Sequence, residues 1–457
     1  MVAVDPGRWM GERGALPGSP KHPVCPTMRI LASLTWMAFF LLESAAADKA
    51  NWPRFRGPDG AGVAADQAVP LKLDESSRAW SVPLPGPGSS SPVVWGEKVF
   101  VTSENRMPGL VRLHCFHAED GRSLWSRAVN AGLYRTHKMN NTAAATPAVA
   151  QDLVVFSWYD SGRKVAVLSA FTHGGEKRWN YDIGEFKGAH GLNIVPVIHD
   201  GHVFVAHLHQ RGGFVVSLNA HTGKTAWKRN YPEGSPKTTY MTPLIRKLHG
   251  AAGSRYEVVV SSTSIGVRGL DVRDGRELWS LPGIFDERCI VSPVDILAGS
   301  GKEDSLLTVG CKREGGNNVF LAVRPADARG GSAEVVWRLE SFAPYVPTPV
   351  SDGKTLYVMA DRGVLQAVDP MTGKPRWEKK FPANFYASPL LIGGQLFCLS
   401  RDGEVYAIAV GEEATILARS DLRPGEEVTW VDATPAVAND SLYVRMGARL
   451  DCYRNRK

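Results

Sequence analysis

Polar and aromatic side chains recur shortly before a series of prolines, and their types suit ligand binding. Three residues ahead of the proline, four copies of this arrangement carry such side chains: Asn193, Tyr240, Tyr386 and Asp432. The other copies have small or aliphatic residues there, and a position that only filled a core would not vary in this way. Hydrogen-bonding groups beside flat apolar faces are what a site for a carboxylate, a glycan or a peptide requires. We therefore expect these segments to converge on a binding site.

Further candidates precede the same prolines. The full set of expected ligand-binding residues is His137, Lys138, Asn141, His190, Asn193, Tyr240, Arg288, Tyr386, Trp430 and Asp432. The alternative interpretation is a water-filled channel whose lining serves only solubility.

The histidines and acids of the chain form no recognisable metal or catalytic motif. His137 and His190 lie in different repeats without a third ligand at a usual spacing. The alternation in His207-Leu208-His209 puts two imidazoles on one face of a strand, but two imidazoles alone do not make a zinc or copper site. Asp286-Glu287 and Asp432 are only loose candidates for a general base and are interpreted as solvated loop residues or channel-lining ion pairs. No metal ligand and no catalytic residue is predicted.

The candidate segments are positioned by a unit that recurs about eight times. In its cleanest copy, 347–377, four apolar or β-branched runs are separated by tight turns such as Asp352-Gly353, which leaves no room for a helix. Six copies run from a proline to a tryptophan: Pro92 to Trp125, Pro147 to Trp179, Pro196 to Trp227, Pro243 to Trp279, Pro293 to Trp337 and Pro349 to Trp377. Two more begin at Pro389 and Pro435. Insertions at 246–255 and 298–304 lengthen hairpins between first and second strands, and one at 326–333 widens the last hairpin of the fifth copy.

The last copy stops after three strands, and its missing fourth strand is expected at the other end of the repeats. Residues 79–84, around Trp80, resemble a final strand that precedes the first proline. A closed circle of four-stranded sheets buries both faces of each sheet and leaves no exposed terminal edge. The sequence therefore predicts an all-β fold, an eight-bladed β-propeller that spans 78–457 and is closed by a strand near Trp80.

The N-terminal part has three predicted segments. Residues 1–27 are an upstream extension that ends before Met28, and translation that begins at Met28 is the alternative. Residues 28–47 have the basic, apolar and small-residue regions of a signal peptide. The apolar run is shorter than the roughly twenty residues of a bilayer span, although an uncleaved anchor is the alternative. Residues 48–77 are predicted to form a strap, with 51–63 lying over the outside of the ring; the alternative for 51–63 is a docking motif for a partner.

Charge and cysteine content exclude some functions. The formal charge of +7 comes without a Lys/Arg run or an aromatic-interleaved basic strand, so nucleic-acid binding has no support. Downstream of Cys25, which precedes the expected cleavage site, five cysteines remain without a CxxC motif or an adjacent pair: Cys115, Cys289, Cys311, Cys398 and Cys452. They are interpreted as free thiols that act as small apolar residues.

The turn-and-tryptophan block of the repeat resembles a known family. The stretches AVDPMTGKPRW (367–377), SLNAHTGKTAW (217–227), GLDVRDGRELW (269–279) and HCFHAEDGRSLW (114–125) are similar to the tryptophan-docking repeat of the PQQ-like (quinoprotein-type) propellers. The resemblance covers roughly 78–457. It implies that each tryptophan packs against the neighbouring blade.

The opening stretch NWPRFRGPDGAGV (51–63) is similar to that of exported bacterial PQQ-like repeat proteins. The resemblance implies one of two functions. The first is that of the PQQ-dependent alcohol or sugar dehydrogenases, which are enzymes, and the second is that of BamB, the propeller lipoprotein of outer-membrane assembly, which is a scaffold. The dehydrogenases combine a ring disulfide of adjacent cysteines, a calcium held by Glu and Asn, and an Asp base. This chain lacks adjacent cysteines, and no Glu and Asn stand at positions that would let the calcium site be carried over.

We expect an exported, non-catalytic, monomeric propeller of the periplasm or cell surface, without a cofactor, that engages an envelope protein or polymer at its channel rim. The first alternative is a PQQ-dependent oxidoreductase with an atypical site. The second is a stabilising domain that binds no ligand.

Overall fold

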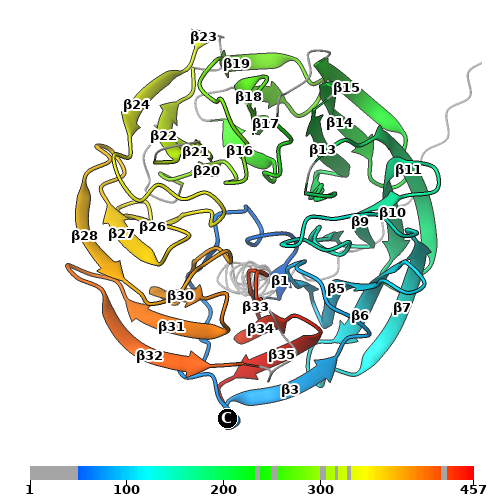
Figure 1. Ribbon diagram of the computed structural model, residues 1–457, viewed down its shortest axis with the longest axis horizontal. Coiled ribbons are helices and arrows are strands. Elements are labelled where there is room, and N and C mark those ends of the chain that lie inside the picture. Colours follow the sequence, from blue (N-terminus) through cyan, green and yellow to red (C-terminus); the bar gives the residue numbers. More distant parts are fainter. Residues whose placement is uncertain are drawn as a thin grey trace, which may run out of the picture. The chain divides into compact units, whose positions relative to one another are not determined.

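Eight antiparallel sheets follow one another along the chain and form a ring (Figure 1). The computed structural model describes residues 50–188, 190–210, 212–231, 237–248, 255–298, 305–313, 317–326, 331–423 and 430–456. All of them belong to one unit, Ala47–Lys457. Segments 1–27 and 28–47 lie outside the described residues. Where the chain is described, no helix is long and apolar enough to cross a membrane.

Each sheet contains one blade of four antiparallel strands, and the sheets of blades 1, 4 and 7 each include a fifth strand. Blade 1 contains β4 (Val93–Trp95), β5 (Lys98–Asn105), β6 (Leu110–His117) and β7 (Ser123–Asn130). Blade 2 contains β8 (Ala148–Ala150), β9 (Leu153–Asp160), β10 (Val165–Thr172) and β11 (Lys177–Glu185). Blade 3 contains β12 (Val197–His199), β13 (His202–His209), β14 (Gly212–Asn219) and β15 (Thr225–Tyr231). Blade 4 contains β16 (Leu244–Leu248), β17 (Arg255–Ser262), β18 (Gly266–Asp271) and β19 (Glu277–Leu281).

The second half of the ring repeats this order. Blade 5 contains β20 (Val294–Asp295), β21 (Leu307–Cys311), β22 (Val319–Arg324) and β24 (Glu334–Arg338). Blade 6 contains β25 (Val350–Ser351), β26 (Leu356–Met359), β27 (Val364–Val368) and β28 (Pro375–Lys380). Blade 7 contains β29 (Leu390–Ile392), β30 (Gln395–Leu399), β31 (Glu404–Ala409) and β32 (Thr415–Asp421). Blade 8 contains β33 (Ala436–Ala438), β34 (Ser441–Met446), β35 (Arg449–Arg454) and β3 (Arg78–Pro83).

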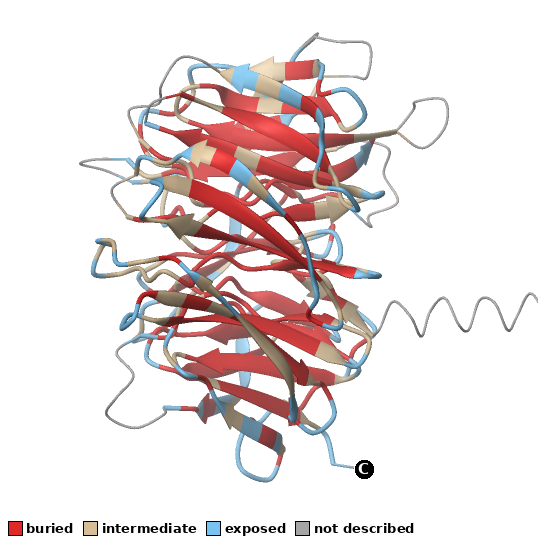
Figure 2. Cartoon of the chain, turned by 90° about the vertical axis from the view of Figure 1, so that its right-hand side faces the viewer, coloured by how far each residue is buried: buried red, intermediate tan, exposed pale blue. Residues whose placement is uncertain are grey.

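The middle strands carry the core. Every residue of β26 and β27 is buried, whereas β28 alternates between exposed and half-buried residues. Figure 2 shows the same gradient, from buried inner strands to exposed outer ones. The sequence of a strand buried on both faces is a nearly continuous apolar run. The sequence of an outer strand with one solvent-exposed face alternates between apolar and polar residues. This burial pattern explains why both kinds of run recur within each copy of the repeat.

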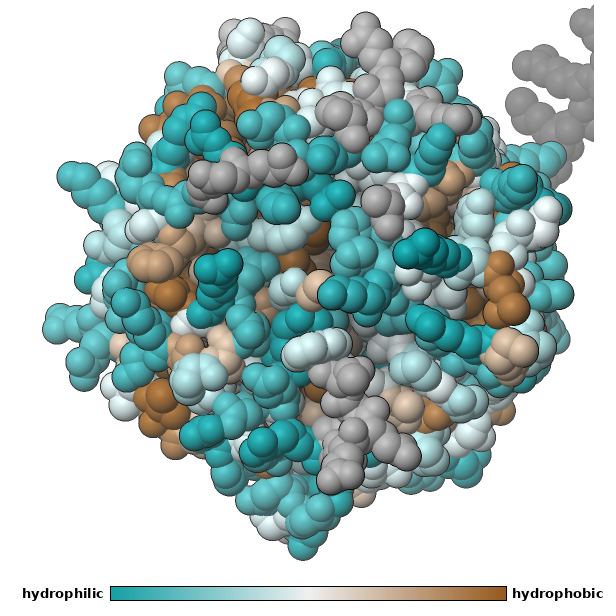
Figure 3. Space-filling view, viewed as in Figure 1, coloured by the Kyte–Doolittle hydropathy of each residue, from teal (hydrophilic) through white to brown (hydrophobic). Residues whose placement is uncertain are grey.

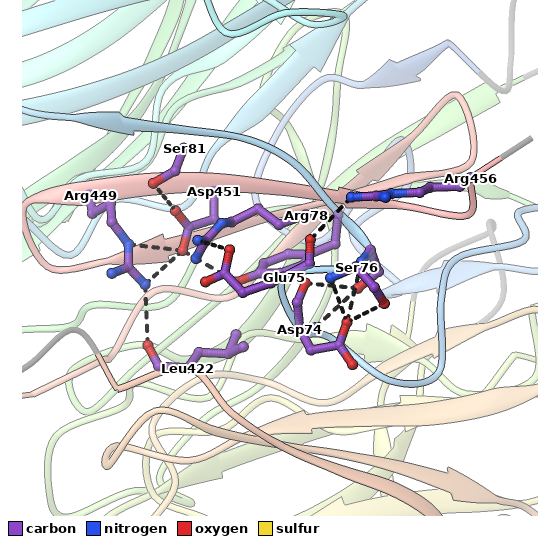
Figure 4. A network of polar contacts seen from close by, with 11 residues as sticks. Asp74, Glu75, Ser76, Arg78, Ser81, Leu422, Arg449, Asp451 and Arg456 are labelled. Carbon is purple, nitrogen blue, oxygen red and sulfur yellow. Dashed lines mark hydrogen bonds and ion pairs between the residues drawn. The ribbon is translucent and has the colours of Figure 1, made fainter.

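The ring closes between the two ends of the repeat region. β3 pairs antiparallel with β35, with Trp80 opposite Cys452. In Figure 1 the pale-blue β3 lies beside the red β35. Polar groups reinforce the joint (Figure 4): the Ser81 hydroxyl donates to Asp451 Oδ1 at 2.6 Å, and Arg449 forms an ion pair with Asp451 at 2.8 Å. The predicted closure and the eight-bladed propeller are confirmed.

The tryptophans join each blade to the next. Six indole N–H groups donate at 2.8–2.9 Å to a backbone carbonyl of the following blade: Trp80 to Ala118, Trp125 to His173, Trp179 to Ala220, Trp227 to Val272, Trp337 to Pro370 and Trp377 to Gly411. The turn glycine of that blade lies beneath the ring. A Cβ at Gly223 would be 2.7 Å from the Trp179 indole, and its φ of +70° also favours glycine.

Blade 4 departs from this scheme. Its Trp279 donates at 2.7 Å to the Glu257 carboxylate of its own blade. A short strand from the third insertion, β23 (Gly331–Ser332), pairs parallel with the outer strand β19. This insertion therefore adds a fifth strand to blade 4 as well as widening the hairpin of blade 5. Residues 249–254, 299–304 and 327–330 of the three insertions lie outside the described residues.

The prediction that 51–63 covers the outside of the ring is wrong. β1 (Asn51–Trp52) pairs with the innermost strand of blade 1, and β2 (Val63–Ala64) pairs with the innermost strand of blade 7. Between them, Arg54 donates to the Pro243 carbonyl of blade 4 at 3.1 Å and Arg56 donates to the Thr348 carbonyl of blade 6 at 2.5 Å. The strap crosses the ring because inner strands present free carbonyls that a buried guanidinium can satisfy. Only its later part, near Leu73, reaches outer strand β32.

Candidate functional site

The connections into the innermost strands build two rings of side chains around the axis. The residues three positions before each proline are Ser89, Ala144, Asn193, Tyr240, Ile290, Val346, Tyr386 and Asp432, and all eight line one cavity. The residues directly before each proline are Ser91, Thr146, Val195, Thr242, Ser292, Thr348, Ser388 and Thr434, and they line it as well. One site thus receives two residues from every blade.

The residues directly before the prolines form the deeper ring, and those three positions before the prolines form the upper ring. The deeper ring is held together by hydrogen bonds to its own hydroxyl groups. The Ser292 backbone N–H donates to the Thr348 hydroxyl at 3.2 Å, and the Thr348 N–H donates to the Ser388 hydroxyl at 3.0 Å. The same bond links Ser91 to Thr146, Thr242 to Ser292, and Ser388 to Thr434, at 2.9–3.0 Å. These bonds satisfy buried polar groups and fix the spacing of neighbouring blades. The lower wall of the cavity is therefore preorganised.

The strap contributes a residue to the cavity as well. Phe55 is part of the lining, and its neighbours Arg54 and Arg56 are buried. Because the strap is bound to inner strands of blades 1, 4, 6 and 7, it closes this part of the channel. The cavity has a volume of about 340 Å³. That size lies within the range of small-molecule sites. Viewed along the ring axis, the face in Figure 3 is mainly hydrophilic.

Six of the ten predicted site residues line this cavity: His190, Asn193, Tyr240, Arg288, Tyr386 and Asp432. His137 and Lys138 instead line a neighbouring cavity of about 320 Å³, although the His137 ring lies 4.3 Å from that of His190. Asn141 donates to the Ser89 hydroxyl at 2.7 Å and supports the wall. Trp430 is 48% exposed and lies outside the lining. The structure confirms the convergence of these segments, while their role in binding stays a prediction.

The sector between blades 4 and 5 is cationic. Arg288 Nη1 donates to the Tyr345 hydroxyl at 3.0 Å, and Lys312 Nζ lies 6.0 Å from the centre of the Tyr345 ring. The Lys312 N–H donates to the Arg288 carbonyl at 3.0 Å, so the backbone holds the two cations side by side. Neither side chain forms an ion pair with a carboxylate of the described residues.

On the side of the cavity formed by blades 7 and 8, the charged side chains form an ion pair. Arg401 donates to both Asp432 oxygens, at 2.7 and 3.2 Å. Its guanidinium carbon lies 4.0 Å from the centre of the Tyr386 ring and 4.4 Å from that of Trp430. Burial raises the pKa of Asp432, and the hydrogen bonds from Arg401 oppose that rise. Asp432 is therefore a channel-lining ion pair, one of the two roles expected for it.

Two lining side chains hold buried polar atoms without a hydrogen-bond partner among the described residues. Asn193 Oδ1 accepts no hydrogen bond there, and Arg288 Nε donates none. An unsatisfied buried polar group costs about 1–3 kcal/mol. A small rotation of these side chains toward a bound molecule would recover that cost. Burial is the largest cause that lowers the pKa of His190, to about 4, and the neighbouring cations Arg288 and Lys312 lower it further, so its imidazole is neutral at pH 7.

Asp361 lies behind the cationic sector and gives a pH prediction. It accepts the N–H groups of Tyr345 at 2.7 Å and Val346 at 3.2 Å, yet burial raises its pKa to about 6. A carboxyl with a raised folded pKa contributes stability below its unfolded pKa and loses it as the pH rises through the folded value. Relative to Asp361→Asn, the wild-type free energy of unfolding is expected to fall by up to about 3 kcal/mol between pH 4 and 6. Urea denaturation of both proteins at pH 4, 5, 6 and 7 measures this; a constant difference would contradict it.

The described residues do not fit a calcium-bound quinone site. They include no group of three or more His, Cys, Asp or Glu that could hold a metal ion. Asp432 is occupied by Arg401, and no two cysteines are adjacent in sequence. The rings of His207 and His209 lie 4.4 Å apart and are tilted by 46° within blade 3, where the His207 Nε2 pairs with the Glu185 carbonyl. These two histidines are packed side chains of the blade.

Comparison with known sequences decides the family. The model of the PQQ-like repeat family described as outer membrane protein assembly factor BamB matches residues 63–185, 112–288 and 322–454. The chain belongs to this family. The matches together span 63–288 and 322–454, which includes every blade except β20, β21 and the start of β22 in blade 5. No curated protein matches the chain.

Solved structures of this family and beyond share the fold. BamB from Moraxella catarrhalis is 16% identical, with a TM-score of 0.53 over 83% of this chain and 97% of that one. A quinohemoprotein alcohol dehydrogenase from Pseudomonas putida HK5 is 15% identical, with a TM-score of 0.58 over 91% and 82%. The computationally designed Ika8 protein is 12% identical, with a TM-score of 0.54 over 83% and 100%. Because BamB, an alcohol dehydrogenase and a designed protein match the chain with TM-scores of 0.53, 0.58 and 0.54 at low identity, the likeness shows the fold alone.

The sequence-based site prediction missed three kinds of residue. The hydroxyl ring was visible as Ser or Thr before seven of the eight prolines. Lys312 was hidden in a turn between second and third strands, and only the fold brings it beside Arg288. No sequence pattern predicts a place for Phe55 in the cavity, because the sequence analysis expects the strap to lie outside the ring.

Proposed function

We propose that the protein is an exported, non-catalytic propeller of the bacterial cell envelope that holds its ligand, or a segment of a partner, in the central cavity. The observation that carries this proposal is the cavity itself, which receives two residues from each blade and has the Phe55 strap in its wall. A channel lined only for solubility would not require cationic, aromatic and amide groups in separate sectors. The signal peptide predicted from the sequence of 28–47 and the family's outer-membrane description support the envelope location.

Catalysis by a bound quinone has less support, because the cavity lacks the acid, calcium and cysteine groups of such a site. In the described lining the one carboxylate is Asp432, and it is paired with Arg401. Dye reduction with alcohols or sugars after addition of PQQ and calcium would contradict the proposal. Purified protein is expected to give no activity above background.

A cavity-filling substitution tests ligand binding. Val346 is half-buried in the upper ring, so Val346→Trp is expected to occupy the space of a ligand. Native mass spectrometry of protein isolated from the envelope should show an added mass that Val346→Trp abolishes. The matched control is Ile416→Trp on outer strand β32, where the side chain is 40% exposed, and it should retain the added mass. A bound species that survives in Val346→Trp would place the ligand elsewhere.

A further inference from the structure

The cavity contains two cations that the protein itself does not neutralise. Arg288 and Lys312 have no ion-pair partner among the described residues, unlike Arg401 with Asp432 or Lys237 with Glu287 at 2.9 Å. Charges in a concave site with low-dielectric walls reinforce one another. Burial lowers the pKa of His190 most, and the charges of Arg288 and Lys312 lower it further. This sector is therefore arranged for negative charge.

The surroundings of the two cations favour an organic acid. Arg288 has a fork of donors, of which Nη1 is fixed by Tyr345 and Nε is unpaired. A guanidinium fork matches the two oxygens of a carboxylate, and an adjacent ammonium adds a point charge. Tyr240, Tyr345 and Tyr386 also line the cavity and offer flat faces for a ring.

We propose that the ligand of the cavity is a small organic acid whose carboxylate pairs with Arg288 and Lys312 and whose planar part packs against the tyrosines. This inference rests on the proposed function, because it names the chemical class of the molecule held at that site.

Three probes of one shape and different charge test the inference. Isothermal titration calorimetry should detect binding of benzoate and no binding of benzamide or benzylamine. Arg288→Gln and Lys312→Gln should each weaken benzoate binding about tenfold or more, because a hydrogen bond to a charged group is lost. Lys380→Gln removes one exposed charge on outer strand β28 and should leave the affinity within about twofold. Near-UV circular dichroism establishes that the variants are folded.

The outcomes separate the two proposals. Equal affinity of wild type and both cavity variants, or no benzoate binding, would overturn the organic-acid inference. A neutral ligand found by native mass spectrometry and displaced by Val346→Trp would overturn it while leaving the proposed function in place. A ligand unaffected by Val346→Trp would overturn both.

A separate observation concerns two thiols behind the cationic sector. Cys289 follows Arg288 and Cys311 precedes Lys312. Both side chains are fully buried in the same core cluster, and the two thiols are close enough for each to influence the pKa of the other. The Lys312 N–H to Arg288 carbonyl bond fixes the two segments next to each other. The other cysteines, Cys115, Cys398 and Cys452, belong to different core clusters.

We infer that Cys289 and Cys311 form a disulfide when the protein folds in the presence of a disulfide oxidant. In the exchange, one thiolate attacks the oxidant to give a mixed disulfide, and the second thiolate displaces the remaining thiol. The protein loses two hydrogens and two electrons, and one oxidant disulfide becomes two thiols. The exchange precedes burial of the pair, because both thiols are inaccessible in the folded state. The link would tie together the two segments that hold Arg288 and Lys312.

Peptide mapping tests this site directly. Protein refolded with oxidised glutathione, then denatured and alkylated without reductant, should give one linked peptide containing Cys289 and Cys311. Cys115, Cys398 and Cys452 should be alkylated in the same sample. Dithiothreitol present throughout refolding should lower the melting temperature of wild type by a few degrees and should not change that of Cys289→Ser/Cys311→Ser. Alkylation of both cysteines after oxidative refolding would overturn the inference.

Discussion

Trp80→Ala is expected to lower the free energy of unfolding by about 3–5 kcal/mol. Trp80 is 8% exposed, its indole N–H donates to the Ala118 carbonyl of blade 1, and its ring lies 5.9 Å from that of Tyr443 in blade 8. The side chain therefore joins the last blade to the first. Because it lies on the strand that closes the ring, its loss weakens the joint on which both blades depend. Guanidinium denaturation followed by circular dichroism measures the change.

Trp430→Ala is the matched control for that substitution. Trp430 is 48% exposed, and its ring contacts Arg401 outside the core. The same change of side chain should therefore cost less than about 1 kcal/mol. Equal destabilisation by the two substitutions would show that the closing tryptophan does not carry the joint.

The second large effect is expected for Arg56→Met, at about 3–5 kcal/mol. Arg56 is 1% exposed and donates to the carbonyls of Thr348, Pro349, Gly60 and Ala61. Methionine fills a similar volume but leaves these buried acceptors unsatisfied. Arg56→Lys should also destabilise, because one ammonium cannot reach acceptors that a planar fork reaches on several sides. Burial lowers the pKa of Arg56 to about 9, and the group remains charged at pH 7.

Hydrogen exchange and denaturation together test this role of the strap. Amides of 50–64 should exchange faster in Arg56→Met, because the strap loses its anchor to blade 6. Arg163→Met is the control: Arg163 is half exposed and pairs with Asp160 and Asp182 at the surface. Such surface pairs contribute about 1 kcal/mol or less. Unchanged exchange in 50–64 would mean that β1 and β2 alone hold the strap.

The repeat made most of the fold predictable. Proline, turn glycine and tryptophan recur at matching positions, and each corresponds to a local requirement: the start of an inner strand, a left-handed turn and a contact with the next blade. Trp80 could be assigned to blade 8 because the last copy lacked a strand. The convergence of Asn193, Tyr240, Tyr386 and Asp432 followed from the same alignment, since equivalent positions of a ring face one axis.

The remaining features depend on contacts that no repeat encodes. The strap occurs once, and the acceptors of Arg56 in blade 6, Thr348 and Pro349, lie 292 and 293 residues away in the chain. Arg401 could have paired with its neighbour Asp402, but the fold brings it to Asp432. Lys312 reaches Arg288 only because two separate loops meet at the cavity. Sequence patterns of short range carry no information about such pairings.

The union of β3 with β35 joins positions as far apart as Ser81 and Asp451. Closing so long a loop is entropically costly, so this contact is expected to form last, after the intermediate blades have condensed. Until then β35 is expected to have an unpaired edge, which a strand from a neighbouring copy of the chain can occupy in place of the chain's own N-terminal segment. The pairing of β3 with β35, which closes the ring, is therefore expected to make correct assembly depend on protein concentration.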